Sequence, residues 1–294
     1  MSKFGIQAID LNGTQRTGIR GYQVDFGKQV ESEGSDGTVY QTMHNIIQAK
    51  PAVDLTTFAA RAMTNIMTGS SDFPLIALDG TNGLKMYGAK VASNNAGPAS
   101  GSVHRVRTAL RGLLYASRYS WSFPGYLEMG IRGMFYAANG TTDPITTGQT
   151  TLPTQPLPTE KLTLETLTIG GNQLTNVRSV EVTIDPKLDW DFSTGLPYPV
   201  DISGAGAKGH LEVRMEVDAD ELDVGEGTGA CSAAFKVVSA NAAGIGATGL
   251  TLTLNGAWGI EEGWGGQQGS PMSRRLVVRT VYQSATRPLT TTVV

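Results

Sequence analysis

Few side chains in this sequence have the types and spacing that catalysis or metal binding requires. The three histidines, His44, His104 and His210, lie far apart along the chain. The single cysteine, Cys231, has no second thiol with which to hold zinc or form a disulfide, so we expect a small, buried, apolar side chain there. No Gly-x-Ser-x-Gly elbow occurs, although a Ser-His-Asp triad assembled from distant residues is compatible with the sequence.

Three other segments look chemical at first sight. Residues 259–269 are rich in glycine but contain two glutamates and no lysine, which predicts a flexible hairpin tip instead of a phosphate loop. Residues 218–226 are acidic without calcium-loop spacing and predict a surface turn. Trp258 and Trp264 could stack on a sugar, but aromatic residues in a hairpin more often pair across strands. We therefore predict a non-enzymatic protein with no catalytic residue, no bound metal and no cofactor.

Composition restricts the class of protein further. The chain has 294 residues, of which 40% are hydrophobic, a net charge of −3 and a pI near 5.7. This length allows one large or two ordinary domains with real cores. The low pI argues against a dedicated nucleic-acid binder, and no apolar run is long enough for a membrane span.

Strand patterns are the clearest signals of secondary structure. Residues 210–218 alternate apolar and charged side chains, as does the segment 178–184, so each predicts a strand with one buried face. Residues 250–254 and 276–282 add two more strands. Mainly β structure with antiparallel sheets is therefore expected, in the form of two tandem sandwich or barrel domains.

Helical signals are fewer. Residues 54–68 could begin as a strand and continue as a short helix, and residues 103–117 have the apolar spacing of an amphipathic helix. The arginines on and after the second segment indicate either a solvated face or a subunit contact. Residues 139–159 are rich in Thr, Pro and Gly and predict an extended linker. The predicted division is a first domain at 1–140 with an insertion, a linker at 141–160, and a second domain at 161–294.

An internal repeat supports this division. When the sequence is shifted by 158 positions, residues 4–59 align without a gap on residues 162–217 with ten identical pairs, more than chance similarity provides. Two β-rich stretches of similar composition are the alternative explanation. The copies diverge beyond residue 59, and the first is expected to carry extra sequence between residues 73 and 121. The identical pairs are Gly13/Gly171, Gln15/Gln173, Thr17/Thr175, Arg20/Arg178, Val24/Val182, Ser35/Ser193, Gly37/Gly195, Tyr40/Tyr198, Ala49/Ala207 and Lys50/Lys208.

Charge is distributed unequally between the two halves. Residues 1–147 contain 13 Lys and Arg against 10 Asp and Glu, whereas residues 148–294 contain 10 against 16. Halves of opposite sign suit head-to-tail contact around a ring.

The second copy resembles a known family. The stretch 174–185, the following segment 195–202 and the strand at 209–218 are similar to the core of tail tube proteins of long-tailed bacteriophages, and residues 19–57 resemble it in the first copy. The resemblance implies β-sandwich subunits that close into rings with a continuous barrel, and rings that stack into a tube for DNA. Most rings of that family contain six single-domain subunits.

From this resemblance we expect a structural virion protein of the tail, made in the host cytoplasm, whose two copies allow three chains to fill six positions. A hexamer, and a tail hub or distal adaptor, are the alternatives within the family. A carbohydrate-binding β-sandwich is the alternative from another class. The expected partners are further copies of the chain, other tail proteins and DNA in transit.

Two groups of residues are candidates for such roles. A neutral or acidic lumen would avoid holding phosphate; the same side chains also fit an ordinary solvated strand face. The long loops 29–47 and 187–205 should become ordered by packing on a neighbouring subunit or ring. The candidates for the lumen are Asp185, Glu212, Arg214 and Glu216, and those for the loop contacts are Glu33, Asp36, Tyr40, Asp191 and Tyr198.

Overall fold

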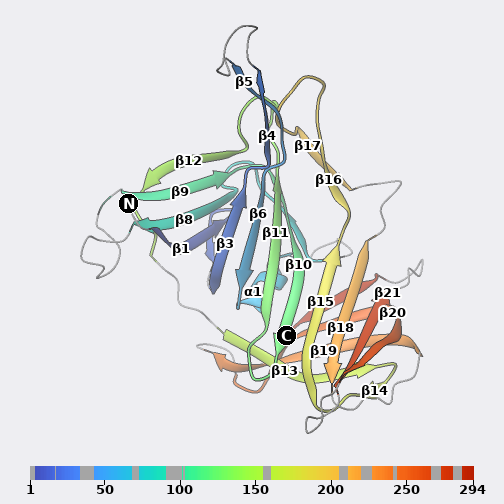
Figure 1. Cartoon of the computed structure of the whole chain (residues 1–294). Coiled ribbons are helices and arrows are strands. Elements are labelled where there is room, and N and C mark those ends of the chain that lie inside the picture. The colour runs from blue at the N-terminus through green and yellow to red at the C-terminus, as the bar shows by residue number, and fades with distance from the viewer. Residues whose placement is uncertain are drawn as a thin grey trace.

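The computed structural model of the chain is mainly β, as the sequence predicts, with 22 strands and one helix among the described residues (Figure 1). The described residues are 4–16, 18–33, 43–67, 73–90, 101, 103–154, 160–204, 211–219, 227–240, 244–265, 273–280 and 287–294.

The elements up to residue 150 are β1 (Phe4–Leu11), β2 (Thr14–Arg16), β3 (Ile19–Asp25), β4 (Lys28–Glu33), β5 (Met43–Ala49), β6 (Ala52–Thr57), α1 (Ala60–Met67), β7 (Leu75–Ala77), β8 (Leu84–Lys90), β9 (His104–Ala109), β10 (Gly112–Ser122), β11 (Glu128–Phe135) and β12 (Ile145–Thr150).

The elements after residue 159 are β13 (Glu160–Ile169), β14 (Asn172–Gln173), β15 (Val177–Asp185), β16 (Leu188–Asp191), β17 (Asp201–Gly204), β18 (Glu212–Ala219), β19 (Gly227–Ala240), β20 (Thr248–Gly265), β21 (Ser273–Thr280) and β22 (Leu289–Val293).

The strands form two large sheets and two hairpins. One sheet has the order β12-β9-β8-β1-β2, and the other has the order β14-β13-β19-β20-β21-β18-β15-β10-β11-β6-β3, with β22 beside β20 and β7 beside β10. The hairpins are β4–β5 and β16–β17. Figure 1 shows β3, β6, β11, β10, β15 and β18 side by side, so one sheet crosses from the first half of the chain to the second.

The strand order repeats between the two halves. β12-β9-β8-β1-β2 corresponds to β22-β20-β19-β13-β14, and β10-β11-β6-β3 corresponds to β20-β21-β18-β15. The long strand β20 therefore occupies the places of both β9 and β10, and Gly256, where φ is 59°, lies at the position that matches the turn between these two strands.

The register of the strands repeats as well. The pairing Leu11↔Thr14 of β1 with β2 recurs 158 positions later as Ile169↔Asn172. A break in register falls at Gln7 when β1 pairs with β8 and at Glu165, again 158 positions later, when β13 pairs with β19. Such register breaks are β-bulges, and bulges at matching positions are regular features of a fold.

The later strands repeat with another shift. β10 and β11 pair with a break between Ala116 and Arg118, and β20 and β21 pair with one between Glu261 and Gly263, 145 positions later. The extra sequence of the first half is therefore α1 and β7, at residues 60–77. The expected location between residues 73 and 121 is wrong for most of its length, because β8, β9 and β10 all have counterparts.

The alignment without a gap also needs a correction. Tyr22 pairs with Leu55 between β3 and β6, whereas Val180 pairs with Val217 between β15 and β18. Val180 lies 158 positions after Tyr22, but Val217 lies 162 after Leu55, so the second copy has four additional residues before β18. Because four is even, the buried and exposed faces of the strand keep their phase.

The alternating segments form strands as expected. Val180, Val182 and Ile184 of β15 and Val213, Met215 and Val217 of β18 are all at most 2% exposed. The helix expected within residues 54–68 is present as α1, after the strand β6. Its buried residues Ala60, Met63 and Met67 lie on one face.

The helix expected at residues 103–117 is wrong, because this segment forms β9, a turn and β10. Gly112 adopts a φ of 154°, and a Cβ there would lie 2.2 Å from the carbonyl oxygen of Met134. Apolar residues three and four apart fit a helix, but here they lie on two strands on either side of a bend. Leu110, which the helix would have buried, is 42% exposed at that bend.

The segment expected to be a linker is without helix in its described part, but it contains the strand β12, which pairs along its whole length with β9. The hairpins β4–β5 and β16–β17 replace the two expected long loops. The division into separate domains at residues 1–140 and 161–294 stays a prediction.

Candidate assembly surface

The two halves of the chain are joined by the edges of two strands. β10 pairs with β15 from Arg118↔Thr183 to Ser122↔Ser179. Beneath this joint, Tyr119 stands opposite Val182, and both side chains are buried. The joint is therefore both a backbone ladder and part of the hydrophobic core.

The counterparts of these two edges have no strand beside them within the described part of the chain. β3, the counterpart of β15, pairs with β6 alone. Residues Gly263–Gly265 of β20, the counterpart of the joined part of β10, pair with β21 alone. Each half of the sheet thus has the same two edges: β3 and β10 in the first half, and β15 and residues 263–265 of β20 in the second. Within the chain, the β10 edge of the first half pairs with the β15 edge of the second.

A second contact accompanies the joint, since the segment that links β16 to β17 lies against the first half. The N–H of Ala49 donates to the carbonyl oxygen of Pro197 at 2.8 Å, and that of Ala137 donates to Pro199 at 2.8 Å. In return, the N–H of Tyr198 donates to the carbonyl oxygen of Gly140 at 3.1 Å.

Tyr198 is the predicted loop residue that this contact buries. Its side chain is 8% exposed and packs with Ala49 and Ala137. The Lys28 Nζ lies 5.9 Å from the centre of its ring and 2.7 Å from Asp143 Oδ2. The hydrogen bond to Asp143 raises the pKa of Lys28. The sequence predicts that the loop 187–205 packs on a neighbouring subunit or ring. In the structure this segment packs on the first half of its own chain.

The other predicted loop residues have different surroundings. Asp191 accepts a hydrogen bond from the Ser203 hydroxyl at 3.1 Å and so closes its own hairpin. Glu33 is the last residue of β4, opposite Met43. Asp36 and Tyr40 lie outside the described residues.

Residues that the sequence analysis did not single out complete the contact. Lys50 Nζ lies 3.4 Å from Asp189 Oδ1 and 5.6 Å from the centre of the Trp190 ring. Trp190 also packs against the cluster formed by Tyr115, Met134 and Ile202. The ungapped alignment pairs Lys50 and Ala49 with identical residues, but the four additional residues before β18 leave the shift of 158 supported only up to the pair Ile46 and Gly204, so the repeat gives a secure signal for Tyr198 and not for Lys50.

The four candidate lumen residues share the solvent face of β15 and β18. Asp185 stands opposite Glu212, and Arg214 and Glu216 follow on the same face of β18. Lys187 forms an ion pair with Asp185 and lies 4.0 Å from Glu212. Partial burial alone would raise the pKa of Asp185, but the hydrogen bonds from the Lys187 ammonium and N–H outweigh it and lower this pKa.

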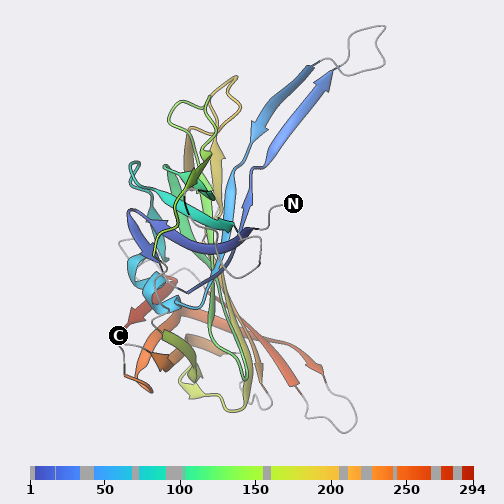
Figure 2. The ribbon, with the colours of Figure 1, turned by 90° about the vertical axis from the view of Figure 1, so that its left-hand side faces the viewer.

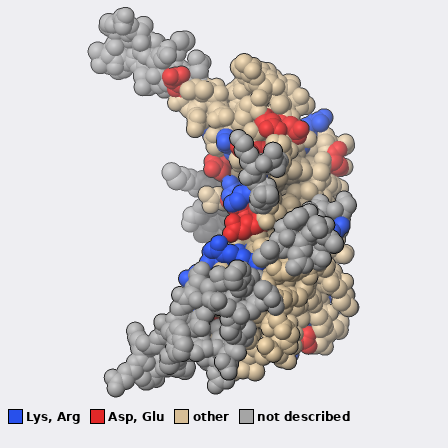
Figure 3. Space-filling model, turned by 90° about the vertical axis from the view of Figure 1, so that its right-hand side faces the viewer, with Lys and Arg blue, Asp and Glu red and all other residues tan. Residues whose placement is uncertain are grey.

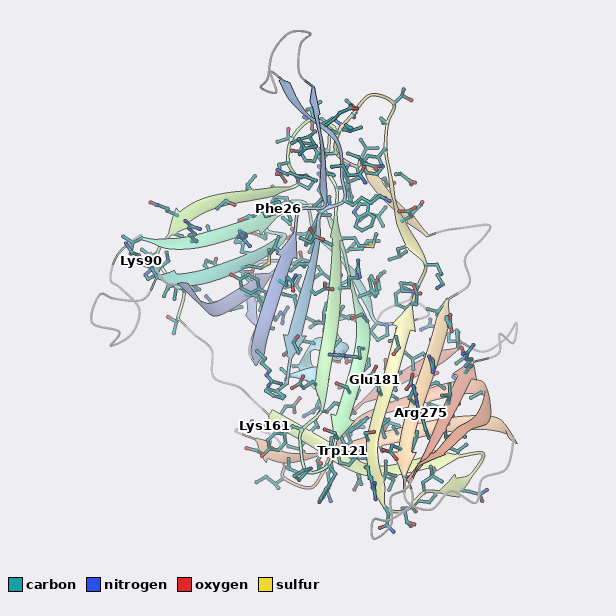
Figure 4. All side chains as sticks on the ribbon, in the orientation of Figure 1. Phe26, Lys90, Trp121, Lys161, Glu181 and Arg275 are labelled. Atoms are coloured by element: carbon teal, nitrogen blue, oxygen red, sulfur yellow. The ribbon has the colours of Figure 1, made fainter. Side chains whose placement is uncertain are left out.

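Positive and negative groups alternate on this face. Glu216 Oε1 lies 2.9 Å from Arg214 Nη2, and its Oε2 lies 2.5 Å from Arg275 Nη2. Figure 3 shows Lys and Arg beside Asp and Glu along the hollow of the outline, and Figure 4 places Glu181 and Arg275 on this part of the sheet. The four residues are therefore part of a mixed face whose carboxylates have basic neighbours.

The other residues that the sequence analysis considered for chemistry are not part of a catalytic or binding site among the described residues. Cys231 is fully buried with its Sγ 3.3 Å from Met215 Sδ, and burial raises its pKa to about 12. The backbone of Trp258 stands opposite Arg279 and that of Trp264 opposite Arg274, so most of the expected hairpin tip belongs to β20. Residues 220–226 of the predicted acidic turn lie outside the description.

The described residues contain no group of three His, Cys, Asp or Glu side chains that could hold a metal. The same part of the chain contains no helix long and apolar enough to cross a membrane. Comparison of the sequence with models of protein families and with curated proteins finds no match.

Proposed function

We propose that this chain is a structural protein of a bacteriophage tail whose copies join into rings, and that stacked rings form the tube through which the genome passes. The observation that carries the proposal is the joint between β10 and β15, together with the two equivalent edges, beside which the described residues place no strand. An open edge is a liability for a folded protein, and pairing it with another copy removes it.

The contact that follows is head-to-tail. The edge of β3 in one chain would pair with residues 263–265 of β20 in the next, so each chain offers one edge of each kind. Such heterologous contacts produce a closed ring when the rotation closes, and closing a sheet into a barrel leaves no free edges.

The repeat supplies the expected register. Thr183 of the joint corresponds to Asp25, and Arg118 corresponds to Gly263. In the proposed contact Asp25 therefore stands opposite Gly263, and Gln23 stands opposite Gly265. Val24 is the identical counterpart of the buried Val182, so the proposed contact has the same β-branched residue at this position.

A ring of three chains follows from the proposal that six repeated units close the barrel, as in the family that the sequence resembles. The mixed face of β15 and β18 suits a DNA conduit, because paired charges leave no excess of cations to retain phosphate. The opposite net charges of the two halves also favour contact between the first half of one chain and the second half of the next.

The test is to purify the protein and determine its mass by sedimentation and its form by electron microscopy. Stacked rings whose single layer has the mass of three chains would support the tube. Single closed rings that never stack would favour a hub or adaptor, and monomers at all concentrations would refute assembly through the edges.

A further inference from the structure

The hairpin β4–β5 is an arm with two apolar side chains largely in solvent, whereas Ala49 and Ile46 on β5 pack with Ala137 and Tyr198. It forms a sheet of two strands, and Figure 2 shows it extending away from the rest of the chain. Val30 is 56% exposed and Ile47 is 54% exposed on its two strands. An isolated hairpin of two strands is marginally stable in water, so an arm of this kind needs a surface to cover it.

The repeat identifies the counterpart of the arm as the hairpin β16–β17. The pair Val30↔Ile46 recurs 158 positions later as Leu188↔Gly204, and Glu33↔Met43 recurs as Asp191↔Asp201. The two hairpins thus have the same register as well as the same place in the strand order.

The counterpart hairpin, unlike the part of the arm around Val30 and Ile47, has a surface to lie on. Ile202 is 8% exposed and forms a cluster with Tyr115 and Met134, against which Leu188 and Trp190 also pack. Tyr115 and Met134 belong to β10 and β11 in the other half of the chain. A hairpin of one half is therefore seated on the sheet of the other half.

The equivalent seat for the arm lies on the second half. The positions 145 residues after Leu113 and Tyr115 are Trp258 and Ile260 of β20, both large and apolar residue types, and the position 145 after Met134 is Arg279 of β21. Within one chain the arm belongs to the first half, whose sheet edge β3 is at the far end of the large sheet from β20. The seat that matches the arm is thus on another copy.

We propose that the β4–β5 arm of one chain docks on β20 of a second copy, around Trp258 and Ile260, as β16–β17 docks on β10 within the chain. This inference rests on the proposed head-to-tail assembly. To the pairing of the β3 and β20 edges, the inference adds a second contact between the same two chains, which buries Val30 and Ile47.

The first experiment changes the arm without touching the core. In the variant Val30→Asp, Ile47→Asp both substitutions fall on exposed positions, so the chain should fold, which circular dichroism and thermal melting check. Charging both apolar side chains should raise the protein concentration needed for ring formation by on the order of tenfold or more. The control is Val30→Thr, Ile47→Thr, which keeps β-branched side chains and should change this concentration far less.

The second experiment detects the contact itself. Val30→Cys and Ile260→Cys are prepared in separate chains, mixed, and treated with a short bis-maleimide, which should link one chain to another. Leu188→Cys with Tyr115→Cys in one chain occupies the positions that correspond to Val30 and Ile260, so it is the matched control and should link within the chain. Cys231 is buried and should not react.

The outcomes separate the two proposals. Rings that form unchanged in the double-aspartate variant, without a Val30–Ile260 link in the mixed chains, overturn the arm contact and leave the edge pairing intact. Loss of stacking with normal single rings also overturns it, because the arm would then contact the next ring. Absence of rings in the unmodified protein refutes the proposed function itself.

Discussion

The ion pair between Arg61 and Glu160 offers a quantitative test of how the two halves of the chain hold together. Arg61 lies on α1 and Glu160 begins β13, and the distance from Nη1 to Oε2 is 2.9 Å. The Glu160 side chain is only 4% exposed and that of Arg61 is 27% exposed. The substitution Arg61→Met would leave a buried carboxylate without its cation.

The expected cost follows from that burial. Removing one partner of a buried ion pair costs about 3–5 kcal/mol, and the partial exposure of Arg61 places this pair near about 3 kcal/mol. The double variant Arg61→Met, Glu160→Met should recover most of this loss, because it removes both charges together. The exposed pair Lys50–Asp189 is the control, and Lys50→Met should cost no more than about 1 kcal/mol.

Urea unfolding at one fixed protein concentration measures these differences. With a slope of about 3 kcal/mol per molar urea, Arg61→Met lowers the midpoint by about 1 M. A midpoint within about 0.2 M of the unmodified protein, or a double variant less stable than Arg61→Met alone, would refute the claim that α1 and β13 share a buried ion pair.

Three further predictions concern stability, the lumen and the thiol. The N–H groups of Gly83, Thr81 and Asn82 donate to Asp79 and lower its pKa from 3.8 to about 2; the stability this adds is complete above the ordinary pKa and is lost as pH falls through the folded value. The deficit of Asp79→Ala in thermal melting should therefore shrink between about pH 4 and about pH 2, and a constant deficit would contradict it. Val213→Asp should prevent folding by burying a charge at a fully buried position, whereas Glu212→Lys should fold and assemble but slow genome passage; normal infectivity with the lysine would remove the support for a lumen role of Glu212. Cys231 should resist maleimide until urea unfolds the chain, because its thiol is buried with a pKa of about 12, and rapid labelling of the folded protein would refute this.

The sequence predicts strands well where one face is buried and the other is wet. β15 and β18 have this character, so a period of two is visible in their side chains. The segment 103–117 misleads because its apolar residues serve two strands on either side of a bend. Gly112 is the local sign of that bend, since its backbone approaches Met134 too closely for any side chain.

The assembly surface is predictable only in part. The repeat in the sequence identifies Tyr198 as retained, but it does not say what this residue contacts. The contact of residues 118–122 with residues 179–183 depends on how two sheets meet in space, which no periodicity encodes. The four-residue shift before β18 likewise becomes visible only in the pairing of the strands.

The most direct test of the account is disulfide trapping of the proposed pairing between chains. Cysteines placed at Gln23 and Gly265 should oxidise into links between chains and yield covalent closed oligomers, because directly opposed residues lie within disulfide reach. Ser120→Cys with Glu181→Cys, the same pair of positions at the joint within the chain, should form an intrachain disulfide under the same conditions. If that control closes while Gln23 and Gly265 give no link, or link as readily as the off-register pair Asp25 and Gly265, then the β3 and β20 edges do not meet as proposed.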